Sequence, residues 1–254
     1  MEGETMFKQL SGGHLYSDKI DNGILFPVGG SSRGASNILL TIDIEQFEPL
    51  FDKIKKNAHL LMTSKPTKEW YESYQTGLDF SVFCHMCAFN NVMRAYYPDI
   101  ITTGSEHAKF YRSKEEIKLS DVVSNKKCAC TEFSILAQTY FQSQNIPTRY
   151  VGGELGWYTD NDFNFEEHSY IALTNKGKNY IYDPVNPVRR DKSILPRIAK
   201  CNPVNGDYFN KTNSLFDNMT LYYAAGDKCD YLHNLPTTKI NPLLCGAKMG
   251  NNGK

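Results

Sequence analysis

The sequence lacks a long apolar run, an excess of charge of either sign and a regular cysteine framework. Its longest apolar stretches, such as residues 80–89, fall far short of the ~20 residues that span a bilayer, and residues 1–9 lack the hydrophobic segment of a signal peptide. Lys plus Arg and Asp plus Glu number 28 each, so no net field attracts nucleic acid or an anionic membrane. We therefore expect a cytoplasmic protein that binds neither.

The seven cysteines are an odd number at irregular spacings, which suits reduced thiols better than a secreted disulfide framework. The chain has 254 residues, of which 41% are hydrophobic, and neither a repeat nor a clear linker divides it. We therefore expect a single domain over residues 1–254, ending in a disordered tail at 246–254.

The first half of the chain is predicted to be mostly helical over residues of about 40–125. Apolar residues recur at the helical period within 44–62, a second helix is predicted over 80–97, and helical fragments over 105–124. The Gly- and Ser-rich segment 27–37 is interpreted as a linker. It lacks the Lys-Ser/Thr of a phosphate-binding loop, and Arg33 is its only cation.

The second half changes character at Cys130. Residues 130–144 carry an apolar stripe that predicts a helix buried on one side and ended by Asn145-Ile146-Pro147. Three β-like runs follow.

The β-like runs lie at 148–153, 168–174 and 179–183, and residues 175–178 between the last two are typical of a hairpin turn. The segment after Pro184 is expected to be loop-rich, with a weak helix or strand around 215–225. A helix followed by an antiparallel sheet indicates an α+β fold.

Cys130 is the first residue of the predicted helix at 130–144. Unpaired backbone N–H groups at a helix start favour a thiolate and can hold an oxyanion, and Lys126 and Lys127 lie immediately upstream. Taken alone, a cysteine in this position is more often a small buried apolar residue than a nucleophile.

His168 begins one strand of the predicted hairpin and Asp183 ends the other. Antiparallel pairing places these positions side by side, so Asp183 can orient the His168 ring toward a neighbouring helix start. Individually, His168 fits a strand histidine and Asp183 an Asp-Pro turn residue. Their joint occurrence with Cys130 predicts a Cys-His-Asp triad.

Three motifs within residues 128–186 resemble the transglutaminase-like superfamily. They are the segment CTEFSILAQTYFQSQNIPTRYVGG with Cys130, Glu132, Phe133 and Ile146-Pro147-x-Arg149, the strand His168-Ser169-Tyr170-Ile171, and the strand Tyr180-Ile181-Tyr182-Asp183-Pro184. Asn145 stands where the family has Gly, and Asn also adopts the left-handed conformation at a helix end. The resemblance implies a papain-like core in which a central helix packs on an antiparallel sheet.

The resemblance also implies acyl transfer through a thioester. Cys130 attacks a carboxamide or peptide carbonyl of a protein or peptide, His168 transfers the proton, and Asp183 orients His168. The family includes proteases, deamidases and transglutaminases, so the sequence leaves open whether water or an amine resolves the thioester. No metal or cofactor is implied.

The second oxyanion donor, beyond the Cys130 N–H, is also open. The candidates are the side chains of Asn125, Trp70 and Trp157.

Other functions fit parts of the pattern. The same core can serve as a non-catalytic protein-binding module, and an arylamine-acetyltransferase-like enzyme uses the same triad, although the Ile-Pro-x-Arg turn and the Asp-Pro ending favour the transglutaminase-like pattern. Cys84 and Cys87 form a C-x-x-C that with Cys128 and Cys130 could hold zinc. Their apolar surroundings favour core packing instead.

Four carboxylates precede His168 in the segment DNDFNFEEH: Asp160, Asp162, Glu166 and Glu167. They can be interpreted as a solvated acidic loop. They can also form an acidic rim that attracts a basic segment of a substrate, or an amine acceptor, by its local field.

Overall fold

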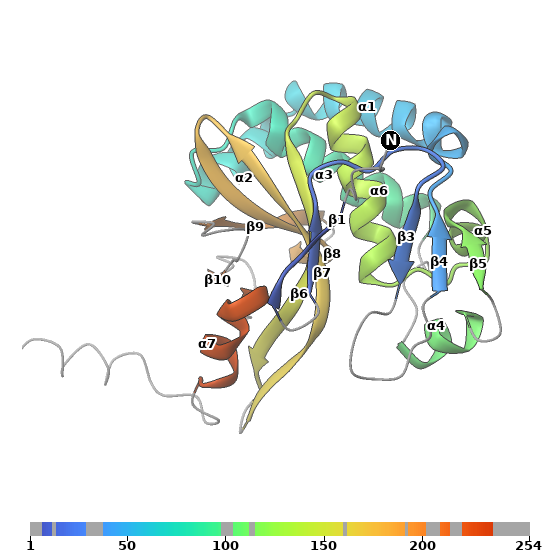
Figure 1. Cartoon of the computed structure of the whole chain (residues 1–254). Coiled ribbons are helices and arrows are strands. Elements are labelled where there is room, and N and C mark those ends of the chain that lie inside the picture. Colours follow the sequence, from blue (N-terminus) through green and yellow to red (C-terminus); the bar gives the residue numbers. More distant parts are fainter. Residues whose placement is uncertain are drawn as a thin grey trace, which may run out of the picture.

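A computed structural model of the chain has an α+β fold in which a large antiparallel sheet lies beside a central helix (Figure 1). The structure describes residues 7–11, 14–28, 38–97, 104–111, 115–159, 162–190, 193–201, 209–213 and 220–235. The helices are α1 Glu48–Met62, α2 Lys65–Tyr74, α3 Phe80–Tyr96, α4 Gly104–Tyr111, α5 Leu119–Ser124, α6 Cys130–Ser143 and α7 Cys229–His233, with 3-10 turns at Ile44–Phe47 and Gly226–Lys228. This confirms the predicted α+β class.

The large sheet has the strand order β1-β2-β6-β7-β8-β9, and β11 joins it by pairing with both β6 and β10. Its strands are β1 Phe7–Gln9, β2 Leu15–Ser17, β6 Thr148–Tyr158, β7 Phe163–Asn175, β8 Lys178–Arg190, β9 Ser193–Cys201, β10 Phe209–Asn213 and β11 Thr220–Ala224. A small second sheet has the order β3-β4-β5, formed by Leu25–Val28, Ile38–Thr41 and Glu116–Lys118.

One edge of β6 is divided between two strands that are distant in the sequence. β2 pairs with its first part, where Leu15 lies opposite Gly152, and β11 pairs with its second part, where Ala224 lies opposite Glu154. Gly153 lies at this fork, and a Cβ there would be 2.2 Å from the Ala224 carbonyl oxygen. The close approach of β11 therefore requires glycine at residue 153.

The helix α6 is buried on nearly every side. All its residues from Glu132 to Phe141 are buried, because the N-terminal helices and the strands β3 and β4 cover the faces that the large sheet does not (Figure 1). The prediction of a helix buried on one side was therefore too narrow. Asn145 follows the helix at φ +57°, which confirms the left-handed position expected of it.

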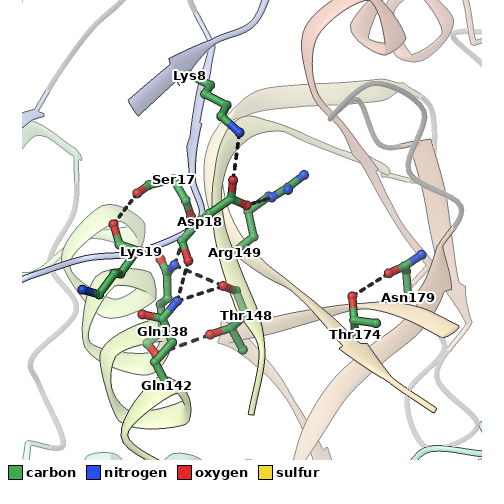
Figure 2. Close-up of polar contacts among 10 residues, drawn as sticks. All are labelled: Lys8, Ser17, Asp18, Lys19, Gln138, Gln142, Thr148, Arg149, Thr174 and Asn179. Atoms are coloured by element: carbon green, nitrogen blue, oxygen red, sulfur yellow. Dashed lines mark hydrogen bonds and ion pairs between the residues drawn. The ribbon is translucent and has the colours of Figure 1, made fainter. Parts of the chain in front are cut away.

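Polar side chains fasten α6 to the sheet at its C-terminal half (Figure 2). Gln138 Nε2 donates to the carbonyls of Ser17 and Thr148, and Gln142 Nε2 donates to those of Asp18 and Thr148. Asp18 in turn forms an ion pair with Arg149, at 2.5 Å between Nε and Oδ1. Arg149, which the resemblance singled out, thus helps to hold the frame.

Most elements predicted in the first half of the chain are confirmed. The helices expected at 44–62 and 80–97 correspond to α1 with its preceding 3-10 turn and to α3, and the fragments at 105–124 to α4 and α5. The short strands β1 to β5 were not predicted. The linker interpretation of 27–37 falls mostly on residues 29–37, which lie outside the described residues, as does the tail at 246–254.

The hairpin at 175–178 is confirmed, because Lys176 and Gly177 both have positive φ, as a two-residue type I′ turn requires. The loop-rich segment expected after Pro184 is wrong for the described residues, because β8 runs on to Arg190 and β9 and β10 follow, whereas the helix or strand expected around 215–225 is confirmed as the strand β11. The β8–β9 ladder is interrupted between Asp183 and Val188, and Pro184, Pro187 and Pro196 fall in that interruption. At these positions the missing N–H groups of the prolines remove no hydrogen bond between β8 and β9.

The largest buried apolar cluster extends from Ile20 to Ile198 and joins the N-terminal helices to α6 and the sheet. The single-domain assignment and the cytoplasmic location stay predictions. Within the described ranges, no helix is both long enough and apolar enough to cross a membrane.

Candidate active site

His168 and Asp183 lie in contact on the neighbouring strands β7 and β8. His168 Nε2 donates a hydrogen bond to Asp183 Oδ2 at 2.9 Å, and the two side chains are only 4% and 0% exposed. The expected juxtaposition is therefore confirmed, although both residues lie within longer strands and not at strand ends. The ring of His168 packs beside the rings of Tyr170 and Tyr223.

Four further donors hold the buried Asp183 carboxylate. Tyr223 Oη and Asn186 Nδ2 donate to Oδ2 at 2.8 and 3.0 Å, and the backbone N–H groups of Val185 and Asn186 donate to Oδ1 at 2.9 and 3.2 Å. Burial alone would raise the pKa of Asp183, but the charge and hydrogen bond of His168, with those of Asn186 and Tyr223, hold it well below its usual value. Asp183 is therefore an anion that cannot turn away from His168.

Cys130 is the first residue of α6, and its half-buried side chain is close enough to His168 to interact electrostatically with its ring. Because Nε2 of His168 contacts Asp183, the other ring nitrogen, Nδ1, is the one left for the thiol. Burial lowers the pKa of His168, but Asp183 and Cys130 outweigh it and hold that pKa well above its usual value. The site thus favours an imidazolium between a carboxylate and the cysteine sulfur.

The start of α6 is fixed by Glu132, a fully buried carboxylate. Its Oε2 accepts the Ala129 N–H at 2.8 Å, while Oε1 accepts from Tyr111 Oη at 2.6 Å and His107 Nε2 at 2.9 Å. Burial raises the pKa of Glu132, but the hydrogen bonds from His107, Tyr111 and Ala129 bring it below its usual value. A charged Glu132 therefore ties α4 to the helix turn that carries Cys130.

A second set of contacts joins the first turn of α6 to β6 and β7. Ser169, next to His168, hydrogen-bonds through Oγ to Tyr150 Oη at 2.6 Å and to Thr131 Oγ1 at 3.3 Å, and its carbonyl accepts from Ser134 Oγ at 3.0 Å. Burial raises the pKa of Tyr150, so its phenol stays protonated near Cys130. These contacts fix Cys130 against the strand that carries His168.

The three side chains considered as oxyanion donors have other contacts. Asn125 follows α5 and donates to the Asp121 carbonyl, Trp70 lies on α2 against the N-terminal core, and Trp157 packs near the far end of β6. Across the described ranges, none joins the hydrogen bonds of His168 and Asp183. The oxyanion donor beyond the Cys130 N–H stays a prediction, and other backbone N–H groups at the start of α6 are of the right chemical type.

Only some of the charged residues near Cys130 and His168 lie where the sequence predicted them. Lys127 lies 3.7 Å from Glu106 in an ion pair. Glu166 and Glu167 are exposed, but on β7 and not in a loop, while Asp162 is exposed just before that strand. Asp160 lies outside the described residues.

The other cysteines near the motif differ from Cys130. Cys128 is fully buried, and burial with the nearby Glu132 holds its pKa well above the usual value. Burial likewise raises the pKa of Cys84 to about 11 and that of Cys87 further, with Cys84 adding to the effect at Cys87. Both lie inside α3, where the neutral thiol is favoured over the thiolate that zinc requires.

Sequence reasoning missed the residues that position the triad. Asn186 could have been noticed, because it follows the Asp of the Asp183-Pro184 pair by three residues, and a polar residue at this distance is typical of a local turn. Tyr223 carries no local signal, since it reaches Asp183 from a strand 40 residues later.

Comparisons of the chain with protein-family models, with curated proteins and with solved structures found no match. The chemistry therefore has to be argued from the site itself.

Proposed function

We propose that the chain is a cysteine-dependent acyl-transfer enzyme, similar to the transglutaminase-like superfamily, which acts on a carboxamide or peptide bond of a protein or peptide. The observation that supports this most strongly is the series Cys130, His168 and Asp183, in which the histidine hydrogen-bonds to Asp183 and interacts electrostatically with Cys130. A thiol, a base and an orienting carboxylate in series are the elements of nucleophilic catalysis.

The resting site pairs the thiol of Cys130 with the ring of His168. Asp183 raises the pKa of His168, so the ring holds a proton readily, and the start of α6 favours negative charge on the attacking sulfur. Five hydrogen bonds fix the carboxylate of Asp183, and this carboxylate fixes the orientation of the His168 ring. His168 takes the thiol proton as the sulfur attacks.

Attack forms a bond from Cys130 Sγ to the carbonyl carbon, and the carbonyl oxygen becomes an oxyanion. N–H groups at the start of α6 are placed to receive that charge. When the C–N bond breaks, His168 gives its proton to the departing ammonia or amine, which leaves a thioester on Cys130.

The second half of the reaction reverses these roles. The now neutral His168 takes a proton from water or from an amine, which attacks the thioester carbon, and the sulfur leaves as thiolate. Water gives a carboxylate and an amine gives a new amide. The acidic rim, of which Asp162, Glu166 and Glu167 are exposed, favours a substrate with a basic segment or a cationic amine acceptor.

The test is incubation with a glutamine-rich protein and a labelled primary amine, with the products read by mass spectrometry. Deamidation adds about 1 Da, amine exchange adds the amine less about 17 Da for ammonia, and proteolysis gives new termini. Cys130→Ala should abolish every product, and Cys128→Ala is the matched control that should retain them.

A second measurement does not depend on the substrate. Iodoacetamide should label Cys130 before the buried cysteines and should still do so near pH 6, because the imidazolium maintains the thiolate. Labelling of Cys130 no faster than that of Cys201, and only above about pH 8, would contradict the proposal and favour a binding module.

A further inference from the structure

A second group of ligand-type side chains lies at the fork where β2 and β11 share the edge of β6. It consists of His14 just before β2, Glu154 on β6 and Cys229 at the start of α7. One ligand atom from each residue lies within 4.8 Å of those from the other two. The three segments are far apart in the sequence and lie together at this fork.

The ring of His14 lies between the other two groups. Its Nδ1 is 3.7 Å from Cys229 Sγ, and its Nε2 is 3.9 Å from Glu154 Oε1. The Gly226 N–H donates to Nδ1 at 3.2 Å, so that nitrogen carries a lone pair, as in the neutral imidazole that binds metals. A metal on Nδ1 would take the place of this N–H.

His233 lies beside this group, because its Nε2 is 2.6 Å from the second carboxylate oxygen of Glu154, Oε2. Cys229 and His233 are four residues apart on α7, so their side chains share one helix face. His233 is 40% exposed and Glu154 13%, which leaves an entry path from solvent.

We propose that His14, Glu154 and Cys229 bind one zinc ion, independently of the acyl-transfer chemistry, and that the ring of His233 turns away from Glu154 to become the fourth ligand. A carboxylate and a thiolate balance the two charges of Zn²⁺, and two neutral imidazoles complete a tetrahedral set. Zn–S bonds of about 2.3 Å and Zn–N or Zn–O bonds of about 2.0 Å place neighbouring ligand atoms roughly 3.3 to 3.7 Å apart. The ligand atoms of His14, Glu154 and Cys229 therefore need a contraction of about 1 Å at their longest separation.

The ion would fasten three chain segments to one another. His14 would hold the entry to β2, Cys229 and His233 would hold α7 after β11, and Glu154 would join both to β6. Since Tyr223 on β11 donates to Asp183, such a site would also keep β11 in register beside the triad. A structural role with four protein ligands is expected, because no position is left for water.

The experiment is titration of the metal-free full-length chain with Co²⁺ and then Zn²⁺. Co²⁺ should give intense visible bands of tetrahedral coordination and a near-ultraviolet thiolate band, saturating at about one ion per chain, and Zn²⁺ should displace both. The midpoint temperature of thermal unfolding should rise by about 5 °C or more when zinc is added. It should return to the metal-free value when a chelator removes the zinc.

Variants identify the ligands. Cys229→Ser should abolish the thiolate band, and His233→Gln, at an exposed position that leaves folding intact, should weaken zinc binding by about 10-fold or more. Cys130→Ala, Cys201→Ser and Cys245→Ser are the matched controls and should keep the band. Absence of saturable binding in the wild-type chain, or a thiolate band that survives Cys229→Ser, would overturn the proposal.

Discussion

The chain contains two clusters with the same three residue types, a cysteine, a histidine and a carboxylate. In the first, His168 hydrogen-bonds to the carboxylate of Asp183 at 2.9 Å and interacts electrostatically with Cys130. In the second, His14 lies 3.7 and 3.9 Å from its neighbours, and the carboxylate of Glu154 is shared with His233.

The difference shows that arrangement, and not residue type, decides the chemistry. Proton transfer needs contacts in series, with the thiol at an accessible end, and Cys130 on a 14-residue helix satisfies this. Metal binding needs several lone pairs around one point. Cys229 is only 6% exposed and lies with ligand atoms of His14 and Glu154 within 4.8 Å, which fits binding and not attack.

Replacing the two thiols should give the largest and cleanest contrast. We expect Cys130→Ala and His168→Ala to lower kcat/KM by about 10⁴-fold or more, because the triad acts as a unit. Cys229→Ser should act on metal content and unfolding temperature instead. Cys128→Ala, the nearest thiol, should retain most of the activity, and an inactive Cys128→Ala would move the nucleophile by two residues.

The carboxylates offer the next test. Asp183→Asn should lower kcat by about 10²- to 10⁴-fold, since the ring of His168 loses its fixed tautomer. Asp183 raises the pKa of His168, so the alkaline limb of the pH profile should move to lower pH in this variant.

The raised pKa of His168 also makes the stability of the fold depend on pH. The charged His168 stabilises the fold fully below its ordinary pKa of about 6.5, and this is lost as the pH rises through its higher folded value. The control for both pH dependences is Glu69→Gln, which removes a surface ion pair on α2. An unshifted alkaline limb in Asp183→Asn would mean that His168 is not the group that titrates.

The frame of the first cluster depends on Glu132. Glu132→Ala should lower the free energy of unfolding by about 3–5 kcal/mol, because His107, Tyr111 and the Ala129 N–H lose their common acceptor. Its pKa is lowered in the fold, so its stabilisation is present above the ordinary value of about 4.3 and is lost as the pH falls through the folded value.

Urea unfolding at pH 7 and at decreasing pH measures this, with the exposed Glu106→Gln as control. Equal stability of the Glu132→Ala variant and the wild type at pH 7 would show that the clamp does not hold the helix start.

The acidic rim should give the smallest effect. Replacing Asp160, Asp162 and Glu166 together by Asn, Asn and Gln should raise the KM for a lysine-rich substrate about two- to fivefold with little change in kcat, because exposed charges act weakly and are screened. The difference should shrink as salt is added. A KM that is the same in the triple variant and across the salt series would leave these residues as an ordinary solvated surface.

The sequence was informative wherever a local pattern decides the structure. Periodicity located α1, α3 and α6, the Lys176-Gly177 turn fixed the register of β7 and β8, and this register brought His168 to Asp183. These outcomes depend on residues close together in the chain.

The remainder depended on contacts that no local pattern records. Loops were predicted at Pro184, Pro187 and Pro196 because proline cannot donate a hydrogen bond within a sheet. The interruption of the β8–β9 ladder that accommodates these prolines can be recognised only once the pairing of the two strands is known. Tyr223 reaches Asp183, and His107 reaches Glu132, across separations of 40 and 25 residues. The second cluster, from residues 14, 154 and 229, has no sequence spacing that would connect it.

The fork on β6 has a consequence for the order of events during synthesis. Cys130, His168 and Asp183 leave the ribosome before β11, the last described strand of the sheet, which supplies Tyr223. A nascent chain that ends before residue 220 carries all three catalytic groups, but the edge of β6 beside His168 is still unpaired and Asp183 lacks one of its donors. The hydrogen bonds around Asp183 are therefore complete only after β11 has been synthesised and has paired with β6.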